Sequence, residues 1–160
     1  MLGVTFLFVG RVKERYFVEA LEEYVKRLRP FCNCEVAEIP ERRLPEAPSV
    51  AQIDSALAAE ADAIIRRIPA GAYVIPLCVE GGQMSSEELA GLFSRLPTEG
   101  VSKICFIVGG SFGLHESVKS RGARRLSMSR MTLPHSLARV VLAEQVYRGF
   151  SIAAGTKYHK

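Results

Sequence analysis

The sequence predicts an α/β fold in which helices flank a mostly parallel sheet. Runs rich in Val, Ile and Phe alternate along the chain with segments of helical periodicity, which is typical of this class. The chain has 160 residues, 48% of them hydrophobic, and a mean hydropathy of +0.12. This composition excludes a disordered chain. At this length we expect one domain, over residues 1–160, with a proper hydrophobic core.

Five segments are predicted to form strands, most of them apolar and rich in β-branched or aromatic residues. The first segment, Leu2 to Val9, follows no basic residue and precedes no small-residue cleavage site, so a strand is favoured over a signal peptide. No uncharged stretch approaches the roughly 18 to 20 apolar residues of a membrane-spanning helix. We therefore expect a cytoplasmic protein without membrane contacts. The predicted strands are Leu2 to Val9, Cys34 to Ile39, Ala72 to Val79, Ile104 to Val108 and Arg125 to Met128.

Capping residues mark where the helices between these strands begin. Ser49 is a favourable N-cap for a helix that continues to Ile68, before Pro69. Ser85 and Glu88 have the spacing of a capping box, in which each side chain bonds the backbone amide of the other residue. The expected helices are Glu14 to Arg29, the segment from Ser49 to Ile68, one announced by Ser85 to Glu88, and a short turn over Glu116 to Ser120.

A last helix is predicted from Pro134 to about Ala154. Proline suits a helix start because the amide proton it lacks has no partner there, and Gly155 is a stop signal. The helix carries an apolar stripe wide enough to pack on the sheet or on a second copy of itself. The stripe consists of Leu137, Val140, Val141, Tyr147 and Phe150.

The four cysteines are expected to be free thiols, and no metal site is expected. Cys32 and Cys34 are only two residues apart, and Cys78 and Cys105 lie inside apolar runs. The chain has no Cys-x-x-Cys pair and no histidine pair at helical spacing, which are the usual signs of a metal site. Its histidines, His115, His135 and His159, are scattered.

Positive charge is concentrated in the last part of the chain. Residues 1–100 contain 11 Lys and Arg against 15 Asp and Glu, whereas residues 101–160 contain 10 against 2, a net charge of +8. Such a segment attracts polyanions, so nucleic acid is the expected class of partner. The cations occur singly or in pairs between apolar residues, which indicates folded elements rather than a tail.

Two glycine clusters, Gly81-Gly82 and Gly109 to Gly113, follow predicted strands. Loops at the carboxyl ends of parallel strands are where α/β proteins bind ligands. Neither cluster has the spacing Gly-x-Gly-x-x-Gly, and no Gly-Lys pair occurs in the chain. The dinucleotide fingerprint and the P-loop are therefore excluded.

The second cluster also matches Gly109-x-Ser111-x-Gly113, the local pattern of a serine-hydrolase nucleophile elbow. A hydrolase would need an acid and then a histidine downstream, for which only Glu116, Glu144 and His159 are available. A serine hydrolase is therefore one alternative, and a non-catalytic RNA-binding protein is another.

Apolar residues alternate with hydroxyl residues from Leu126 to His135, where a strand must give way to a helix. Backbone amides and carbonyls freed there could bind the edge of an adenine while Met and Leu side chains cover its ring. The alternative interpretation is an ordinary turn between a strand and a helix.

Several long motifs are shared with one enzyme family. They are Leu77 to Gly81, Ser85 to Glu88, Val108 to Gly113 and Leu126 to Lys160, together with the opening Val9 to Tyr16. On these residues the chain resembles, over its full length, the ribosomal RNA large subunit methyltransferase H family. Its members are small SPOUT-class enzymes that transfer a methyl group from S-adenosylmethionine to N3 of a pseudouridine in helix 69 of bacterial 23S ribosomal RNA.

The resemblance implies a SPOUT-type α/β domain with a C-terminal trefoil knot, an exception to the rule that chains are not knotted. It implies S-adenosyl-L-methionine as cofactor and 23S ribosomal RNA, within the assembled ribosome, as partner. It also implies a homodimer in which the partner subunit completes each active site. The residues that it places around the cofactor are Leu77, Gly109, Met128, Ser129, Arg130, Met131, Thr132 and Leu133.

Methyl transfer requires collinear donor and acceptor and removal of the N3 proton. With the resemblance, His159 and Tyr158 are the candidates for handling that proton, and His135 and Arg139 are the candidates for orienting the base or its phosphate.

Three residues depart from the family pattern. Cys78 stands where an acidic residue is usual, Phe112 where a small or polar residue is usual, and Lys157 where proline often precedes the terminal Tyr-His. Phe112 removes a possible polar group from the glycine cluster, which argues against a base in that loop.

Overall fold

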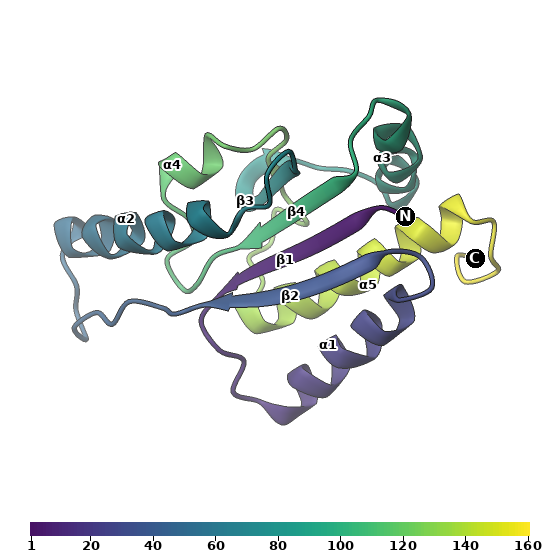
Figure 1. Cartoon of the computed structure of the whole chain (residues 1–160). Coiled ribbons are helices and arrows are strands. Elements are labelled where there is room, and N and C mark those ends of the chain that lie inside the picture. Colours follow the sequence, from purple (N-terminus) through teal and green to yellow (C-terminus); the bar gives the residue numbers. More distant parts are fainter.

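The computed structural model describes all 160 residues and shows a sheet covered by helices on both faces (Figure 1). Four parallel strands lie in the order β2-β1-β4-β3, which confirms the predicted fold class. The strands are β1 (Gly3–Val9), β2 (Asn33–Ile39), β3 (Tyr73–Gly82) and β4 (Lys103–Val108). The helices are α1 (Arg15–Leu28), α2 (Val50–Arg67), α3 (Ser86–Thr98), α4 (Glu116–Lys119) and α5 (His135–Ala153).

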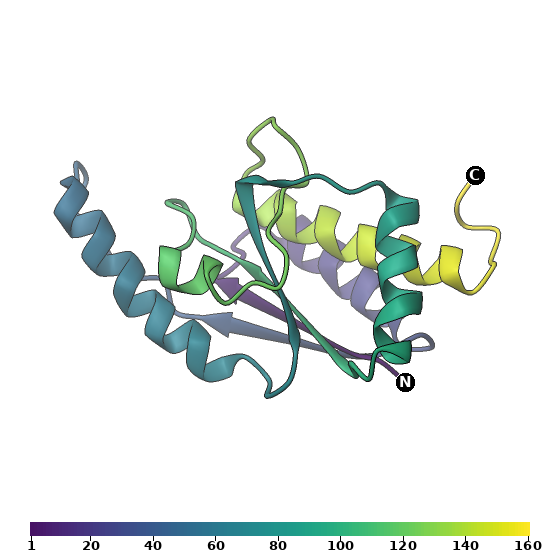
Figure 2. The same cartoon turned by 90° about the horizontal axis from the view of Figure 1, so that it is seen from above.

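Alternation along β1 divides the hydrophobic core into two layers. Phe6 and Phe8 pack on one face of the sheet with buried residues of α1, α3 and α5. Leu7 and Val9 pack on the other face with buried residues of α2 and α4. Successive side chains of a strand point to opposite faces, and a parallel sheet needs both faces covered, so each face carries its own helices (Figure 2).

The helix ends agree with the capping signals in the sequence. Ser85 Oγ accepts from the Glu88 amide at 3.0 Å, and Glu88 Oε2 accepts from the Ser85 amide at 2.6 Å. Ser49 and Gln52 form a second capping box at the start of α2. Gly155 has a φ of +69°, the left-handed conformation in which glycine commonly ends a helix. Pro134 is the N-cap residue of α5.

The segment Arg125 to Met128 is not a strand, so this prediction is wrong. Only Leu126 makes ladder contacts, as isolated bridges to Leu77 and to Gly82. Ser127 Oγ then donates to the Ser129 carbonyl oxygen at 3.0 Å, and this local bond competes with continued strand pairing.

All four cysteines are free, with Cys32 and Cys105 buried and Cys34 and Cys78 half-buried. No group of three or more His, Cys, Asp or Glu side chains is arranged to hold a metal ion. None of the helices combines the length and apolar character needed to cross a membrane.

Helix α5 packs tightly on α3 through Gly149. A Cβ atom at this position would lie 2.7 Å from Cε2 of Phe93, whose ring stacks on Phe150 at a centroid distance of 4.4 Å. A Cβ atom on Gly91, an exposed residue of α3, would meet no atom within 4 Å.

These two helical glycines therefore respond oppositely to alanine. Gly149→Ala should lower the free energy of unfolding by about 1–3 kcal/mol because the fixed Phe93 ring cannot give way. Gly91→Ala should raise it by about 0.5–1 kcal/mol because alanine is the better helix former. Denaturant unfolding of both variants measures the difference, and equal stability would contradict the packing of α3 on α5.

Candidate active site

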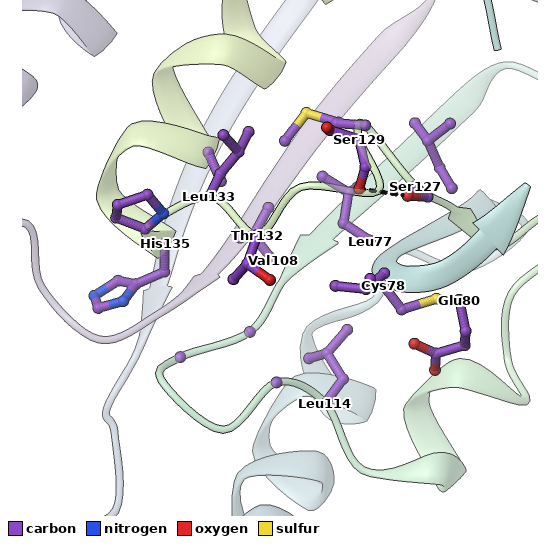
Figure 3. Close-up of a pocket in the computed structure, with 18 of the residues that line it drawn as sticks. Leu77, Cys78, Glu80, Val108, Leu114, Ser127, Ser129, Thr132, Leu133 and His135 are labelled. Carbon is purple, nitrogen blue, oxygen red and sulfur yellow. Dashed lines mark hydrogen bonds between the residues drawn. The ribbon is translucent and has the colours of Figure 1, made fainter. Parts of the chain in front are cut away.

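A cavity of about 720 Å³ opens at the carboxyl ends of β3 and β4. Three segments form its walls (Figure 3): the end of β3, the glycine loop (residues 109–113) and the hydroxyl loop (residues 126–133) that leads into α5. This is the edge of the sheet where α/β proteins bind ligands, and the volume is that of a small-molecule site.

The glycine loop turns so tightly that no side chain fits at Gly109. A Cβ atom on Gly109 would lie 2.4 Å from the carbonyl oxygen of Gly113 and 2.6 Å from its carbonyl carbon. Gly113 has a φ of +81°, and its amide donates to the Gly110 carbonyl oxygen at 3.1 Å. At its glycines the loop therefore presents backbone to the cavity, and a ligand can approach this part of the wall closely.

The hydroxyl loop is anchored on the end of β3. A Cβ atom on Gly81 would lie 2.8 Å from the carbonyl carbon of Leu126, so only glycine fits there. The Gly82 amide donates to the Arg125 carbonyl oxygen at 3.1 Å, and the Ser127 amide donates to the Gly82 carbonyl oxygen at 2.9 Å. Two segments that lie more than forty residues apart in the sequence are thus fixed side by side.

Beyond this anchor, hydroxyl side chains satisfy backbone groups of the loop. Ser127 Oγ donates to the Ser129 carbonyl oxygen, and Ser129 Oγ accepts from the Met131 amide at 2.9 Å. Ser127 is buried, whereas Thr132 is exposed at the rim of the cavity. The alternation of hydroxyl and apolar residues therefore lets a chain segment without regular structure hold a fixed shape.

The cavity walls are mainly apolar, and the charged groups lie at the margin. Leu77, Val108 and Leu133 project into the space in Figure 3. Glu80 forms an ion pair with Lys119, and the hydrogen bond from that ammonium lowers the pKa of Glu80 below its usual range. Burial raises the pKa of the Cys78 thiol, so this departure from the family pattern adds a neutral side chain.

Most of the predicted cofactor residues come together at this cavity. Arg130 does not line it and is exposed on the loop. His135, the first residue of α5, lines the cavity. Sequence reasoning missed Val108, Leu114 and the Glu80–Lys119 pair, although strand ends were the signal for the first. The lining residues that were predicted are Leu77, Gly109, Met128, Ser129, Met131, Thr132 and Leu133.

Arg139 does not lie where we expected, because it is fully buried rather than at the RNA-facing surface. Its guanidinium donates from Nη1 to the Gly10 carbonyl oxygen at 3.0 Å and from Nη2 to the Val9 carbonyl oxygen, and it lies 5.0 Å from the Phe8 ring centroid. The expectation that Arg139 binds a base or phosphate is therefore corrected. It holds the end of β1 on α5.

The C-terminal tail lies against α3 and α5 and lines no part of the cavity. His159 Nε2 lies 2.8 Å from Glu87 Oε1, and His159 Nδ1 lies 3.2 Å from Arg148 Nη1. Tyr158 donates from its hydroxyl to Glu144 Oε1 at 3.2 Å. Within one chain these two residues are therefore separated from the predicted cofactor residues.

Ser111 lacks the surroundings of a hydrolase nucleophile. Its amide donates to Glu41 Oε1 at 3.2 Å, and its hydroxyl makes no hydrogen bond to any histidine. A nucleophile elbow is a strained turn that enters a helix directly, but no residue other than glycine has a positive φ and α4 begins only at Glu116.

Comparison with known proteins identifies one family. A family model described as "Predicted SPOUT methyltransferase" matches residues 2–159. The chain is 43% identical to the ribosomal RNA large subunit methyltransferase H of Listeria monocytogenes, over 99% of this chain and 100% of that protein. It is also 43% identical to the protein of the same name from Moorella thermoacetica, over the full length of both chains.

Solved structures share the fold at low sequence identity. A probable methyltransferase from Bordetella pertussis superposes with a TM-score of 0.59 at 16% identity, over 93% of this chain and 95% of that one. A methylase-family protein from Haemophilus influenzae gives a TM-score of 0.55 at 13% identity, over 100% and 72% of the two chains.

The position of the C-terminal tail predicts how Tyr158 titrates at alkaline pH. Burial, followed by the nearby Glu144 carboxylate, raises the pKa of Tyr158 to about 12, above the value of about 10 in unfolded chains. The stability that this shift contributes is complete below pH 10 and lost as pH rises through 12. In a spectrophotometric titration, Tyr158→Phe should remove absorbance that develops near pH 12 in the folded protein and near pH 10 in denaturant. If Tyr158→Phe instead removes absorbance that develops near pH 10 in both states, the result would contradict the position of the tail.

Proposed function

The chain belongs to the SPOUT methyltransferase family, and we propose that it methylates ribosomal RNA. In this reaction a methyl group passes from S-adenosylmethionine to N3 of a pseudouridine in helix 69 of 23S ribosomal RNA. One observation carries the proposal. The glycine loop and the hydroxyl loop, two motifs shared with the ribosomal RNA large subunit methyltransferase H proteins, enclose a single cavity.

The backbone and apolar groups that line the cavity support S-adenosylmethionine as its ligand. The main chain of the glycine loop, which a Cβ atom at Gly109 would disrupt, gives a cofactor close access to backbone groups. Leu77, Met128 and Leu133 supply apolar surface for an adenine ring. When bound, S-adenosylmethionine supplies an electrophilic methyl group on a sulfonium centre.

The residues that act on the acceptor come, in this proposal, from the tail of a second subunit. The tail lines no part of its own cavity, and Leu137, Val140 and Val141 of α5 remain partly exposed, which supports a homodimer that packs through this helix. His159 is the candidate for receiving the N3 proton. Tyr158, whose pKa is raised to about 12, stays neutral at physiological pH and positions the base or the tail instead.

Exposed arginines in the hydroxyl loop and in the segment before it support RNA as substrate. Arg121, Arg124 and Arg130 precede or belong to the hydroxyl loop and form no ion pair. We propose that they contact ribosomal RNA phosphates, within the assembled ribosome in the cytoplasm. We also propose a single domain over residues 1–160 and a trefoil knot, which the bridges from Leu126 to both ends of the segment 77–82 support.

The direct test is methylation of ribosomes that lack the modification. Purified protein and S-adenosylmethionine carrying a labelled methyl group should label 23S RNA, and mass spectrometry should locate the methyl group on N3 of the pseudouridine. RNA binding without cofactor binding or methylation would favour a non-catalytic RNA-binding protein. A serine hydrolase would react with a fluorophosphonate probe at Ser111, which the loop geometry predicts to be unreactive.

The cofactor assignment predicts a selective effect of alanine in the two glycine clusters. Gly109→Ala should weaken S-adenosylmethionine binding at least tenfold because its Cβ atom collides with the Gly113 backbone. Gly82→Ala is the matched control, since its Cβ atom would lie 3.9 Å from the nearest atom and Gly82 does not line the cavity. Calorimetric titration measures both affinities, and equal values would contradict the site.

The proton-transfer assignment predicts a defect in rate. His159→Ala should slow single-turnover methylation about 100-fold or more at saturating ribosome and cofactor, because general-base catalysis is lost. Lys157→Ala in the same tail is the control, because Lys157 is exposed and forms no ion pair. A wild-type rate in the His159 variant would exclude it as the base.

A further inference from the structure

We propose that a second cavity beside the cofactor cavity binds a nucleotide of the substrate RNA that neighbours the methylated one. This inference rests on the proposed RNA methylation and adds a binding site to it. The cavity has a volume of about 340 Å³ and lies between the loop of residues 40–48, helix α2 and the glycine loop. We call it the flanking cavity.

The flanking cavity shares a wall with the cofactor cavity. Ser111 and Phe112 line both spaces. The methylated nucleotide can therefore meet the cofactor on one side of this wall while its neighbour in the same RNA strand lies on the other side. A nucleotide in the flanking cavity would thus fix the position of its neighbour relative to the methyl donor.

Phe112 supplies the surface that a nucleobase recognises. It is 49% exposed, although exposing a large apolar ring to water is unfavourable, and it is the only Phe or Tyr that lines either cavity. Proteins bind unpaired RNA bases by stacking them on aromatic side chains. An exposed ring between two cavities of an RNA-modifying enzyme therefore fits a base from a single-stranded loop.

The charges around the flanking cavity indicate which parts of a nucleotide bind inside it and which part binds at its rim. Arg42 and Arg43 are exposed and form no ion pair, so their guanidinium groups are free to contact phosphate. The carboxylates of Glu41, Glu46 and Glu60 repel phosphate from the interior. The interior therefore suits the uncharged base and ribose, whose amino and 2′-hydroxyl groups can donate to a carboxylate.

Two of these carboxylates shape the cavity instead of facing a ligand. Glu60, 5% exposed, accepts from the Arg42 amide at 2.8 Å, and burial raises its pKa above the usual range. Glu41 accepts from the Ser111 amide at 3.2 Å, and its Oε1 would lie 2.4 Å from a Cβ atom on Gly110. The 40–48 loop is thus tied both to α2 and to the glycine loop, which leaves Glu46 to accept from a nucleotide.

The stacking role is tested by changing Phe112. We would measure the rate of single-turnover methylation against the concentration of unmethylated ribosomes, and cofactor affinity by calorimetry. Phe112→Ala should raise the half-saturating ribosome concentration about 5- to 50-fold, the effect expected from removing one stacked base. Phe112→Trp should restore it, since it keeps an aromatic face, and the difference between the two variants should persist at saturating cofactor.

The phosphate role is tested with matched arginine pairs. Replacing both Arg42 and Arg43 with Ala should reduce the slope of log affinity against log salt by about 0.7 for each single-strand phosphate that the arginines neutralise in the wild-type complex. Replacing Arg66 and Arg67 with Ala, an exposed pair at the opposite end of α2, removes the same charge and should leave the slope near that of the wild-type protein.

The outcomes separate this inference from the proposed function. If the wild-type protein does not methylate ribosomes, the proposed function fails. The flanking site is overturned if the wild-type protein methylates ribosomes but two results fail to appear. These are a higher half-saturating ribosome concentration for Phe112→Ala, and a lower salt slope for the Arg42 and Arg43 variant than for the Arg66 and Arg67 control. It is also overturned if saturating cofactor abolishes the defect of Phe112→Ala, or if this variant dissociates a dimer in sedimentation, because Phe112 would then act through the cofactor or through a subunit interface.

Discussion

The site depends on the close approach of Gly81 at the end of β3 to the backbone of Arg125 and Leu126. A Cβ atom at Gly81 would lie within 3 Å of three atoms of these two residues, so this contact exists only with glycine. Hydrogen bonds on both sides of Leu126 hold the segment in place. Because the hydroxyl loop and the start of α5 follow directly, their position over the cavity derives from this contact.

A second constraint acts at the carboxyl end of the central strand β1. The buried guanidinium of Arg139 binds the carbonyl groups of Val9, the last residue of β1, and of Gly10, which follows it. It thereby couples α5 to the edge of the sheet that carries the site. Its Nε atom has no hydrogen-bond partner, and burial lowers the pKa of the side chain. Such a buried charge carries a desolvation cost, so its value to the protein lies in fixing geometry.

Much of the fold follows from local pattern. Apolar runs located the four observed strands, and the Ser85–Glu88 capping box and Gly155 located helix ends, because these signals act over a few residues. The glycine loop was also recognisable as a candidate ligand site from its place after β4. The family resemblance supplied most of the hydroxyl-loop assignments, which local pattern left open between a binding loop and a turn.

The errors concern features that only tertiary packing decides. Arg125 to Met128 has strand-like composition, but its backbone partners lie at the end of β3 and its pairing stops at Ser127. Arg139 is charged, which favours a surface position, yet its helical position faces the core. Phe112 was recognised as unusual, but its place between two cavities depends on the loop after β2, which no local signal connects with the glycine loop.

We propose that the glycine and hydroxyl loops form one cofactor site because β3 holds them together. Backbone hydrogen exchange of the protein with and without S-adenosylmethionine tests it most directly. We expect binding to slow exchange in residues 109–113 and 126–133 together, and to leave exchange in residues 57–67 of α2 unchanged. Binding that protects only one of the two loops, or protects α2 instead, would contradict it.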